Sequence, residues 1–346
     1  AALAPAVRLP TQTWAWMTTA AELLAPAGSL HVVLDEGDEG RVAGVAPLSR
    51  DADEGRRLAL LGVAALSEPT DLLAASPEAL ERLARRLART SLPLQLERVP
   101  ADSPAVEALR AAYRGRGLVV CREQVGTPTI RLGPKWEEPE HVLGARRRSD
   151  LRRARRRAES MGEVAFRFHA PGAGEVDAVL EQVYAIEARS WRAARGGSLA
   201  QDPLRGPFFR RLAERASEEG TFRAWILEIG GKPAAMQYAV EVAGGFWLLK
   251  IGYDEAFARC SPGMLLMVES IRRAAGAGLA SYEFLGVIED WTRLWTTEVR
   301  PCVTVRTYPL GLRGAAALAR DGAGALGRRI RRGPGEGDTR SGEDDG

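Results

Sequence analysis

The feature that most constrains this chain is the stretch 246–286, whose pattern changes from strand to helix and back to strand. It opens with an apolar, aromatic-rich run from Phe246 to Tyr253, short enough to be a buried strand. A loop with Pro262 and Gly263 follows, and from Met264 onward apolar residues recur at the spacing of one buried helix face. Residues 282–285 then predict another short strand.

This order of elements matters because a helix start carries unpaired backbone N–H groups and partial positive charge. A glycine there lets a phosphate approach the backbone closely. The loop from Arg259 to Leu265 is therefore a candidate for holding the pyrophosphate of a nucleotide-containing cofactor. A Pro-Gly pair is also common at an ordinary turn before a helix, so both interpretations stay open.

Composition limits what the rest of the chain can be. The 346 residues, 45% of them hydrophobic, are enough for two ordinary domains. The formal net charge of +3 gives no global bias toward nucleic acid. No apolar run approaches the length of about 20 residues that a membrane span needs, and the N-terminus lacks a signal-peptide pattern. We therefore expect a soluble protein.

Cysteine and histidine are rare and scattered, so we expect no metal site and no disulfide. The cysteines are Cys121, Cys260 and Cys302, and the histidines are His31, His141 and His169. Cys260 lies in the candidate loop, where a nucleophile is one interpretation and a small buried apolar residue the favoured one. These facts predict a reducing, cytoplasmic location.

The first half alternates helices and strands, as an α/β domain does. The expected helices are 11–24, 77–90 and 103–113, and the expected strands are 31–34, 41–48, 57–61, 94–96 and 118–130. No glycine-rich loop joins a strand to a helix in this half. Asp71 follows a Pro-Thr pair where a strand should end, which is consistent with a substrate cleft or, more simply, a turn.

The most biased segment is RRRSDLRRARRR at 146–157, with eight arginines, one aspartate and a net charge of +7. Such a segment predicts a helix, because arginine is a good helix former. It is either a solvated connecting helix or a surface that meets phosphate on a nucleotide, a lipid-linked sugar or RNA. No interleaved aromatic residues or nucleic-acid module accompany it, so a dedicated DNA binder is not expected.

The second half predicts a strand, two helices, three antiparallel strands, a helix, a strand, a short helix and a final strand. The expected strands are 164–168, 222–229, 233–242, 246–253, 282–285 and 303–308, and the expected helices are 176–191, 204–216, 264–275 and 291–295. Residues 311–346 are of low complexity. Residues 311–330 allow a weak helix, and 333–346 should be disordered.

This order of elements resembles the GNAT acyltransferase fold, and in detail the CelD-like group, which is related to FemAB-type aminoacyltransferases. Five stretches carry the resemblance across residues 10–310, namely RSDLRRARRRAESMG, IEARSWRAARGG, GGKPAAMQYAVEVAGGFWLLKIGYD, SPGMLLMVESIRRAAGAG and YEFLGVIEDWTRLW. The resemblance implies an α/β fold of two tandem GNAT-like domains, each a mixed sheet flanked by helices. We expect an N-terminal domain without a cofactor site at 1–140, a connecting helix at 141–160 and an acyltransferase domain at 161–310.

The resemblance further implies acetyl-CoA or another acyl-CoA as the acyl donor. Matched to the family pattern, the donor-binding residues would be Lys250, Ile251, Gly252, Arg259, Ser261, Gly263, Met264 and Leu265. The chain departs from the usual loop, since Pro262 and Met264 stand where relatives have glycines. It also has Trp291 and Thr292 where relatives often have Tyr-Lys, so a phenol that could act as a general acid is missing there.

Acyl transfer to an amine requires a group that takes the proton of the amine, and a carboxylate is the natural one. Glu283 is the first candidate and Glu187 the second, although each is equally consistent with a structural salt bridge to an arginine. Asp71, Trp191, Arg192 and Trp291 are candidates for the substrate cleft. Sequence alone does not locate the backbone N–H that would stabilise the oxyanion.

Together these observations predict an N-acyltransferase that acylates an amino group on a small metabolite or a polysaccharide or cell-envelope precursor. The first alternative is a FemAB-like aminoacyltransferase that uses aminoacyl-tRNA, which would bind through the arginine-rich segment. The second is a non-catalytic scaffold of an envelope-biosynthesis complex that keeps the fold.

Overall fold

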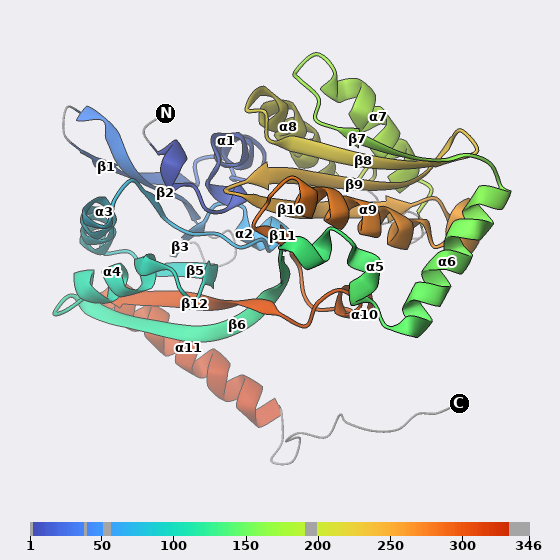
Figure 1. Ribbon diagram of the computed structural model, residues 1–346. Helices are drawn as coiled ribbons and strands as arrows, with labels where there is room; N and C mark the ends of the chain where they lie inside the picture. The colour runs from blue at the N-terminus through green and yellow to red at the C-terminus, as the bar shows by residue number, and fades with distance from the viewer. Residues whose placement is uncertain (1–2, 38–39, 51–56, 191–198, 332–346) are drawn as a thin grey trace.

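The structure, a computed structural model, describes residues 3–37, 40–50, 57–190 and 199–331 (Figure 1). Within these residues the strands form one mixed sheet of twelve, in the spatial order β1-β2-β3-β5-β12-β6-β11-β10-β9-β8-β7, with β4 paired to β2. The strands are β1 (Leu30–Glu36), β2 (Val42–Arg50), β3 (Leu58–Leu60), β4 (Leu73–Ala74), β5 (Leu94–Pro100), β6 (Gly117–Arg131), β7 (Val164–His169), β8 (Phe222–Ile229), β9 (Lys232–Val242), β10 (Gly245–Tyr253), β11 (Ser281–Glu283) and β12 (Val299–Pro309).

Helices cover the faces of this sheet, which confirms the expected α/β class. They are α1 (Trp14–Leu23), α2 (Val63–Leu66), α3 (Pro77–Arg89), α4 (Pro104–Ala112), α5 (Pro139–Val142), α6 (Ala145–Ser160), α7 (Val176–Glu187), α8 (Arg205–Glu218), α9 (Pro262–Gly276), α10 (Asp290–Arg293) and α11 (Leu312–Arg331). Most begin and end within a few residues of the expected bounds, because their apolar spacing and caps are local signals.

One long strand, β6, joins the two halves. Its first part, Gly117–Pro128, pairs with β12, and its last residues, Thr129–Arg131, pair with β11 of the second half. Strand β12 in turn pairs with β5. A strand from the end of the expected second domain therefore lies inside the sheet of the first half, between β5 and β6. The expected division of the chain into two domains joined at residues 141–160 remains a prediction.

Buried apolar side chains form three clusters around this sheet. One lies under α3 and α4 in the first half. A second lies between the sheet and α9. The third lies under α7 and α8 and takes in Trp16 of α1, whose ring meets Phe208 edge-on with centroids 5.2 Å apart. Helix α1, from the first half of the chain, thus packs against a helix of the second half.

The structure differs from the sequence expectations in a few places. The segment before Pro262, expected as a loop, is a 3-10 helix from Glu255 to Cys260, capped by Asp254. Helix α7 ends at Glu187 rather than 191. Helix α11 forms where a weak helix was allowed, and the buried guanidinium of Arg57 holds it through Asp321 at 2.8 Å. Residues 333–346, expected to be disordered, lie outside the described residues.

Two features are absent from the described residues. None of the helices there combines the length and apolar character of a membrane span. No group of three or more His, Cys, Asp and Glu side chains in the described ranges is arranged to hold a metal ion.

Candidate active site

The candidate site begins where β10 and β11 separate. These strands pair in parallel only from Gly245 to Trp247, opposite Ser281 to Glu283. Strand β10 continues to Tyr253 against β9, with a bulge between Leu248 and Lys250. The β11-facing edge of β10 is therefore unpaired by β11 beyond Trp247, and a bulge is a common device for re-aiming a strand beside an active site.

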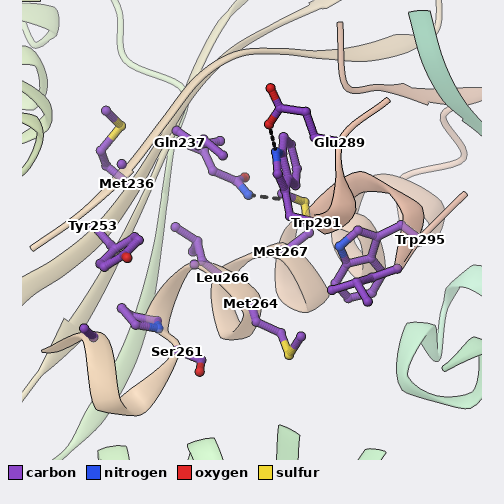
Figure 2. A pocket seen from close by; sticks show the side chains of 16 residues that line it. Met236, Gln237, Tyr253, Ser261, Met264, Leu266, Met267, Glu289, Trp291 and Trp295 are labelled. Atoms are coloured by element: carbon purple, nitrogen blue, oxygen red, sulfur yellow. Dashed lines mark hydrogen bonds between the residues drawn. The ribbon is translucent and has the colours of Figure 1, made fainter. Parts of the chain in front are cut away.

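A cavity of about 380 Å³ lies beside this open edge of β10. Residues from β9, β10, the start of α9 and the segment around α10 line it (Figure 2). They are Met236, Gln237, Ile251, Gly252, Tyr253, Ala258, Ser261, Pro262, Gly263, Met264, Leu266, Met267, Glu289, Trp291, Leu294 and Trp295. The lining is mostly apolar with a few polar groups, as is typical of small-molecule sites.

Helix α9 presents its N-terminus to this cavity. Ser261 precedes it in the left-handed conformation, with φ of 45°, and its side chain makes no capping hydrogen bond. Pro262 occupies the first turn, where its missing N–H costs nothing. A Cβ placed on Gly263 would meet only Tyr253 Cδ1, at 4.0 Å, so the space beside this residue is open. The positive end of a 15-residue helix therefore faces a cavity.

Six of the residues expected at the site line this one cavity, namely Ile251, Gly252, Ser261, Gly263, Met264 and Trp291. Three other residues expected to bind the donor do not. Leu265 is buried in the core cluster under α9. The Arg259 side chain is exposed, and its carbonyl accepts a hydrogen bond from Arg157 Nη1 at 3.1 Å. Lys250 points to the other face of the sheet. Trp191 and Arg192 lie outside the described residues.

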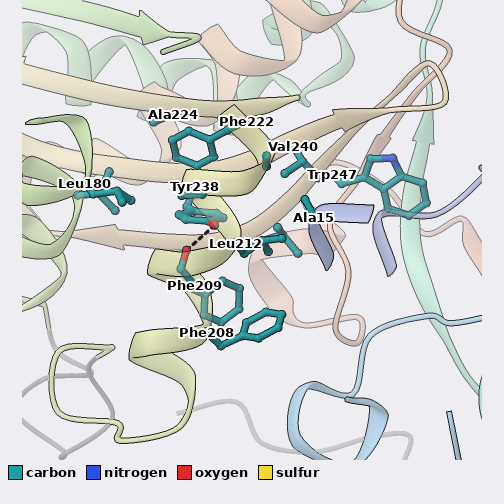
Figure 3. Close-up of a cluster of buried hydrophobic side chains, with 14 of the residues drawn as sticks. Ala15, Leu180, Phe208, Phe209, Leu212, Phe222, Ala224, Tyr238, Val240 and Trp247 are labelled. Atoms are coloured by element: carbon teal, nitrogen blue, oxygen red, sulfur yellow. Dashed lines mark hydrogen bonds between the residues drawn. The ribbon is translucent and has the colours of Figure 1, made fainter. Parts of the chain in front are cut away.

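The opposite face of β10 rests on the aromatic cluster under α8 (Figure 3). There the Tyr238 hydroxyl donates to the Phe209 carbonyl at 2.8 Å. The ammonium of Lys250 lies over the Phe209 ring, 4.4 Å from its centroid. Residues 250 and 251 thus send their side chains to opposite sides, and only the backbone of Lys250 is available to the cavity side.

Glu187 stands at the end of α7, against β10. Its side chain is buried, and Oε2 accepts a hydrogen bond from the Leu199 N–H at 2.9 Å. A Cβ on Gly252 would lie 3.7 Å from both Cα and Cγ of Glu187, so a glycine there lets the end of α7 come close. Gly252 also lines the cavity. Glu187 is therefore a predicted carboxylate that packs against a residue of the cavity lining.

Glu283 is fully buried on β11, at the point where the two strands part. Its Oε1 accepts from Arg300 Nη2 of β12 at 2.5 Å, while Oε2 is shielded from solvent and has no hydrogen-bond partner among the described residues. Glu283 therefore forms the structural salt bridge to an arginine that the sequence analysis gave as one of two interpretations of this residue. Its role in proton transfer remains a prediction.

Gln237 of β9 is a polar residue of the cavity lining that was missed from the sequence. It is buried, and its Oε1 has no partner among the described residues, while Nε2 lies 3.7 Å from Met267 Sδ. Behind it the Tyr282 hydroxyl bonds Ser270 Oγ at 2.9 Å, and burial raises the pKa of Tyr282. A lone glutamine in the otherwise apolar strand AAMQYAV was the available signal.

Glu68, in the loop after α2, was also missed, although it does not line the cavity. Burial raises the pKa of its carboxyl to about 7 against the opposing charges of Lys250, Arg98 and Arg205, and its Oε2 has no partner among the described residues. Arg98 binds the Gly286 carbonyl at 3.0 Å, so this cluster joins both halves. Nothing in the sequence SEPT distinguishes Glu68 from a turn residue.

Asp71 lies close by in the chain but does not line the cavity. Its Oδ1 accepts from the Leu72 N–H at 2.8 Å, which is the turn-like contact expected of an aspartate after Pro-Thr. Burial raises the pKa of Asp71 to about 7, even though hydrogen bonds from Ser103 and Leu72 act in the other direction.

Comparison with known proteins agrees with this geometry. Residues 145–293 match the family model of the acetyltransferase (GNAT) domain. The fold resembles that of FemX, with 13% identity, a TM-score of 0.58 and coverage of 89% of this chain and 94% of that one. It also resembles the C-terminal domain (DUF2156) of a protein described as a putative lysylphosphatidylglycerol synthetase from Agrobacterium fabrum, with 10% identity, a TM-score of 0.55 and coverage of 89% and 95%. A search of the curated proteins found no match.

The split strands, the open helix start and the family match together define an acyltransferase domain. Residues 145–293 are a GNAT acetyltransferase domain, and the fold of the chain resembles that of FemX. The resemblance stated from the sequence and the expected enzyme class are thereby confirmed.

Proposed function

We propose that this protein transfers an acetyl or longer acyl group from acyl-CoA to an amino group of a small metabolite or a polysaccharide or cell-envelope precursor. One observation carries the proposal. The N-terminus of α9, with open space at Gly263, faces an apolar cavity that continues along the unpaired edge of β10. Such a site suits a ligand with a phosphate group at one end and an extended arm at the other.

The residues of the cavity divide into two groups by the part of the donor they suit. Backbone groups at Ser261 to Leu265 would hold the pyrophosphate, as the helix start favours an anion. The edge of β10 from Leu248 to Gly252 would run beside the pantetheine arm, whose amides are able to pair with a strand edge. The buried Oε1 of Gln237 is an acceptor in need of a donor, and an amide N–H of that arm would provide one.

The donor supplies a thioester carbonyl, and the protein must position the amine and take its proton. The amine nitrogen forms the new bond to the carbonyl carbon, the C–S bond breaks, and the sulfur leaves as a thiolate that gains a proton. We assign proton acceptance to Glu187, which contacts β10 at Gly252, and keep Glu283 as the second candidate. A backbone N–H of β10 near the bulge would stabilise the oxyanion.

Calorimetric titration with acetyl-CoA and with a longer acyl-CoA tests the donor site. We expect micromolar binding to the wild type and none to Gly263→Trp, because the indole would fill the cavity. Gly276→Trp is the matched control, since Gly276 ends the same helix away from the cavity, and a Cβ added there would meet no atom within 4 Å. No binding of either thioester to the wild type would refute the proposal.

The alternative donor is aminoacyl-tRNA, and the arginines of α6 are the observation that favours it. The likeness to FemX concerns the fold alone. A scaffold without chemistry is the weaker alternative, because the family match is to acetyltransferases. The acceptor roles of Asp71, Trp191 and Arg192, and a cytoplasmic location, remain predictions.

A further inference from the structure

The arginine-rich segment forms a regular helix, α6, with one small apolar face and arginines around the rest. Leu151, Ala154 and Ala158 are the buried residues of this helix. On the side facing α9, four of its arginines line a groove of about 470 Å³, which we call the α6–α9 groove. These are Arg148, Arg152, Arg155 and Arg156. All four lie on one side of the helix, because the other three follow Arg148 by four, seven and eight residues.

Two of the four arginines already have partners. Arg148 Nη1 donates to the Leu143 carbonyl at 2.7 Å. Arg155 pairs with Glu159 at 2.7 Å and lies over the Phe166 ring. Arg152 and Arg156 are exposed and form no ion pair or hydrogen bond with any described residue. Two guanidinium groups one helical turn apart are therefore available to an anion.

The acids on the other wall do not neutralise these two arginines. Arg272 of α9 pairs with Glu140 at 2.5 Å and also with Glu269. One oxygen of Glu140 has no partner among the described residues, but Glu140 belongs to α5, which precedes the N-terminal end of α6. Arg152 and Arg156 lie about two and three turns along that helix, toward its other end. The positive charge of the groove is thus concentrated away from the acids.

That positive end of the groove lies beside the start of α9. Arg157 contacts the carbonyl of Arg259, and Met161 contacts Cys260, so the C-terminal end of α6 meets the residues just before α9. Leu265 lines the groove, while its neighbour Met264 lines the donor cavity. Adjacent residues near the start of α9 therefore line the groove and the expected donor site.

The floor of the groove is apolar, formed by Leu151, Phe166, Leu265 and Val268. A flat heterocyclic base can lie on such a floor while a phosphate on its ribose reaches guanidinium groups. We propose that the α6–α9 groove binds the adenosine 3′-phosphate end of coenzyme A, with Arg152 and Arg156 holding the phosphomonoester. The inference rests on the proposed donor and assigns the arginine-rich helix a role in selecting it.

The experiment compares four ligands by calorimetry: coenzyme A, dephospho-coenzyme A, adenosine 3′,5′-bisphosphate and bulk tRNA. The groove variant is Arg152→Gln/Arg156→Gln, and the control is Arg146→Gln/Arg147→Gln, which removes the same charge from the same helix outside the groove. We expect the groove variant to weaken coenzyme A and the bisphosphate about tenfold and the control to change them less than about twofold. Dephospho-coenzyme A should bind wild type and groove variant alike.

The outcomes separate this inference from the proposed function. Equal losses in the two double variants, or equal affinity of the wild type for coenzyme A and dephospho-coenzyme A, would overturn the groove assignment. Binding of the bisphosphate that depends on Arg152 and Arg156, without any binding of coenzyme A, would support the groove and refute the donor. If the groove variant weakens only bulk tRNA, the helix is an RNA surface and the inference is wrong.

Discussion

The two halves of the molecule contain similar helix starts with opposite properties. Helix α3 of the first half begins Ser76-Pro77-Glu78, and helix α9 of the second begins Ser261-Pro262-Gly263. At α3 the Ser76 hydroxyl accepts from the Ala79 N–H at 3.2 Å, and a carboxylate, Glu78, occupies the first turn. At α9 the serine makes no cap bond and the third residue has no side chain.

The difference supports the proposal that the acyl donor binds in the second half of the molecule. The N-terminus of α3 has its own anion and its own cap, and the hydrogen bond with Ser76 lowers the pKa of Glu78, which keeps it ionised. The N-terminus of α9 lacks both and opens on a cavity. A single side chain in the first turn thus separates a structural helix from a candidate binding helix on the same sheet.

The largest expected effect concerns the ion pair between Arg300 of β12 and Glu283 of β11, which links the two halves of the sheet. Arg300→Ala would leave Glu283 as a buried carboxylate without its counter-ion, and we expect a loss of about 3–5 kcal/mol in the free energy of unfolding. Urea denaturation followed by circular dichroism measures it. Arg300→Ala combined with Glu283→Gln should recover a large part of the loss. A change below about 1 kcal/mol in the single variant would show that the pair is not a structural link.

The next prediction tests the comparison of the two helix starts, by placing at position 263 of α9 the glutamate that α3 has at position 78. Gly263→Glu places a carboxylate where the donor phosphate is expected, and we predict that acetyl-CoA binding weakens about 100-fold or more. Gly263→Gln, of the same size but uncharged, should weaken it less. The reciprocal change, Glu78→Gly, should leave binding unaltered. Calorimetry measures all three, and equal losses for the glutamate and glutamine variants would show that charge is not the cause.

A smaller effect is expected on the pH dependence of stability, and it arises from the buried carboxyl of Glu68. Its pKa rises from an ordinary value of 4.5 to about 7 on folding, so between these values the folded state holds more protons. Stability should therefore fall as the pH rises from about 4.5 to 7, by about 1–2 kcal/mol for Glu68 given its partial exposure. Asp71 adds a change of the same sign.

Glu68→Gln should raise the melting temperature at pH 8 and flatten its pH dependence, whereas Glu78→Gln, on the exposed first turn of α3, should not. Lys250, Arg98 and Arg205 are the charges that oppose the rise in pKa. An unchanged pH profile in Glu68→Gln would mean that these cations keep the carboxyl ionised throughout.

The local part of this architecture follows from the sequence. The Ser-Pro starts, the apolar spacing of α9 and the arginine content of α6 act within a few residues, so their elements are predictable. The loop at 259–265 was predicted for the same reason, and six of the residues named as candidates line one cavity. Its role in holding a pyrophosphate remains a prediction.

The remainder depends on contacts between distant segments. The pattern of residues 303–308 fits a strand of either half, and only the assembled sheet places β12 between β5 and β6. The raised pKa of Glu68 likewise depends on Lys250 and Arg205, which are far away in the sequence. A turn sequence carries no signal of burial against another half of the molecule, so this residue was missed.

The smallest expected effect is a contrast between the two serines. Ser76→Ala removes the cap of α3 and should cost about 1 kcal/mol in the free energy of unfolding. Ser261→Ala removes no cap bond and keeps a residue without a large side chain at φ of 45°, so we expect a change of less than about 0.5 kcal/mol. Urea denaturation of both variants measures the difference. If Ser261→Ala proved as costly as Ser76→Ala, the start of α9 would be capped in solution like that of α3, and the space beside Gly263 would no longer distinguish the two helices.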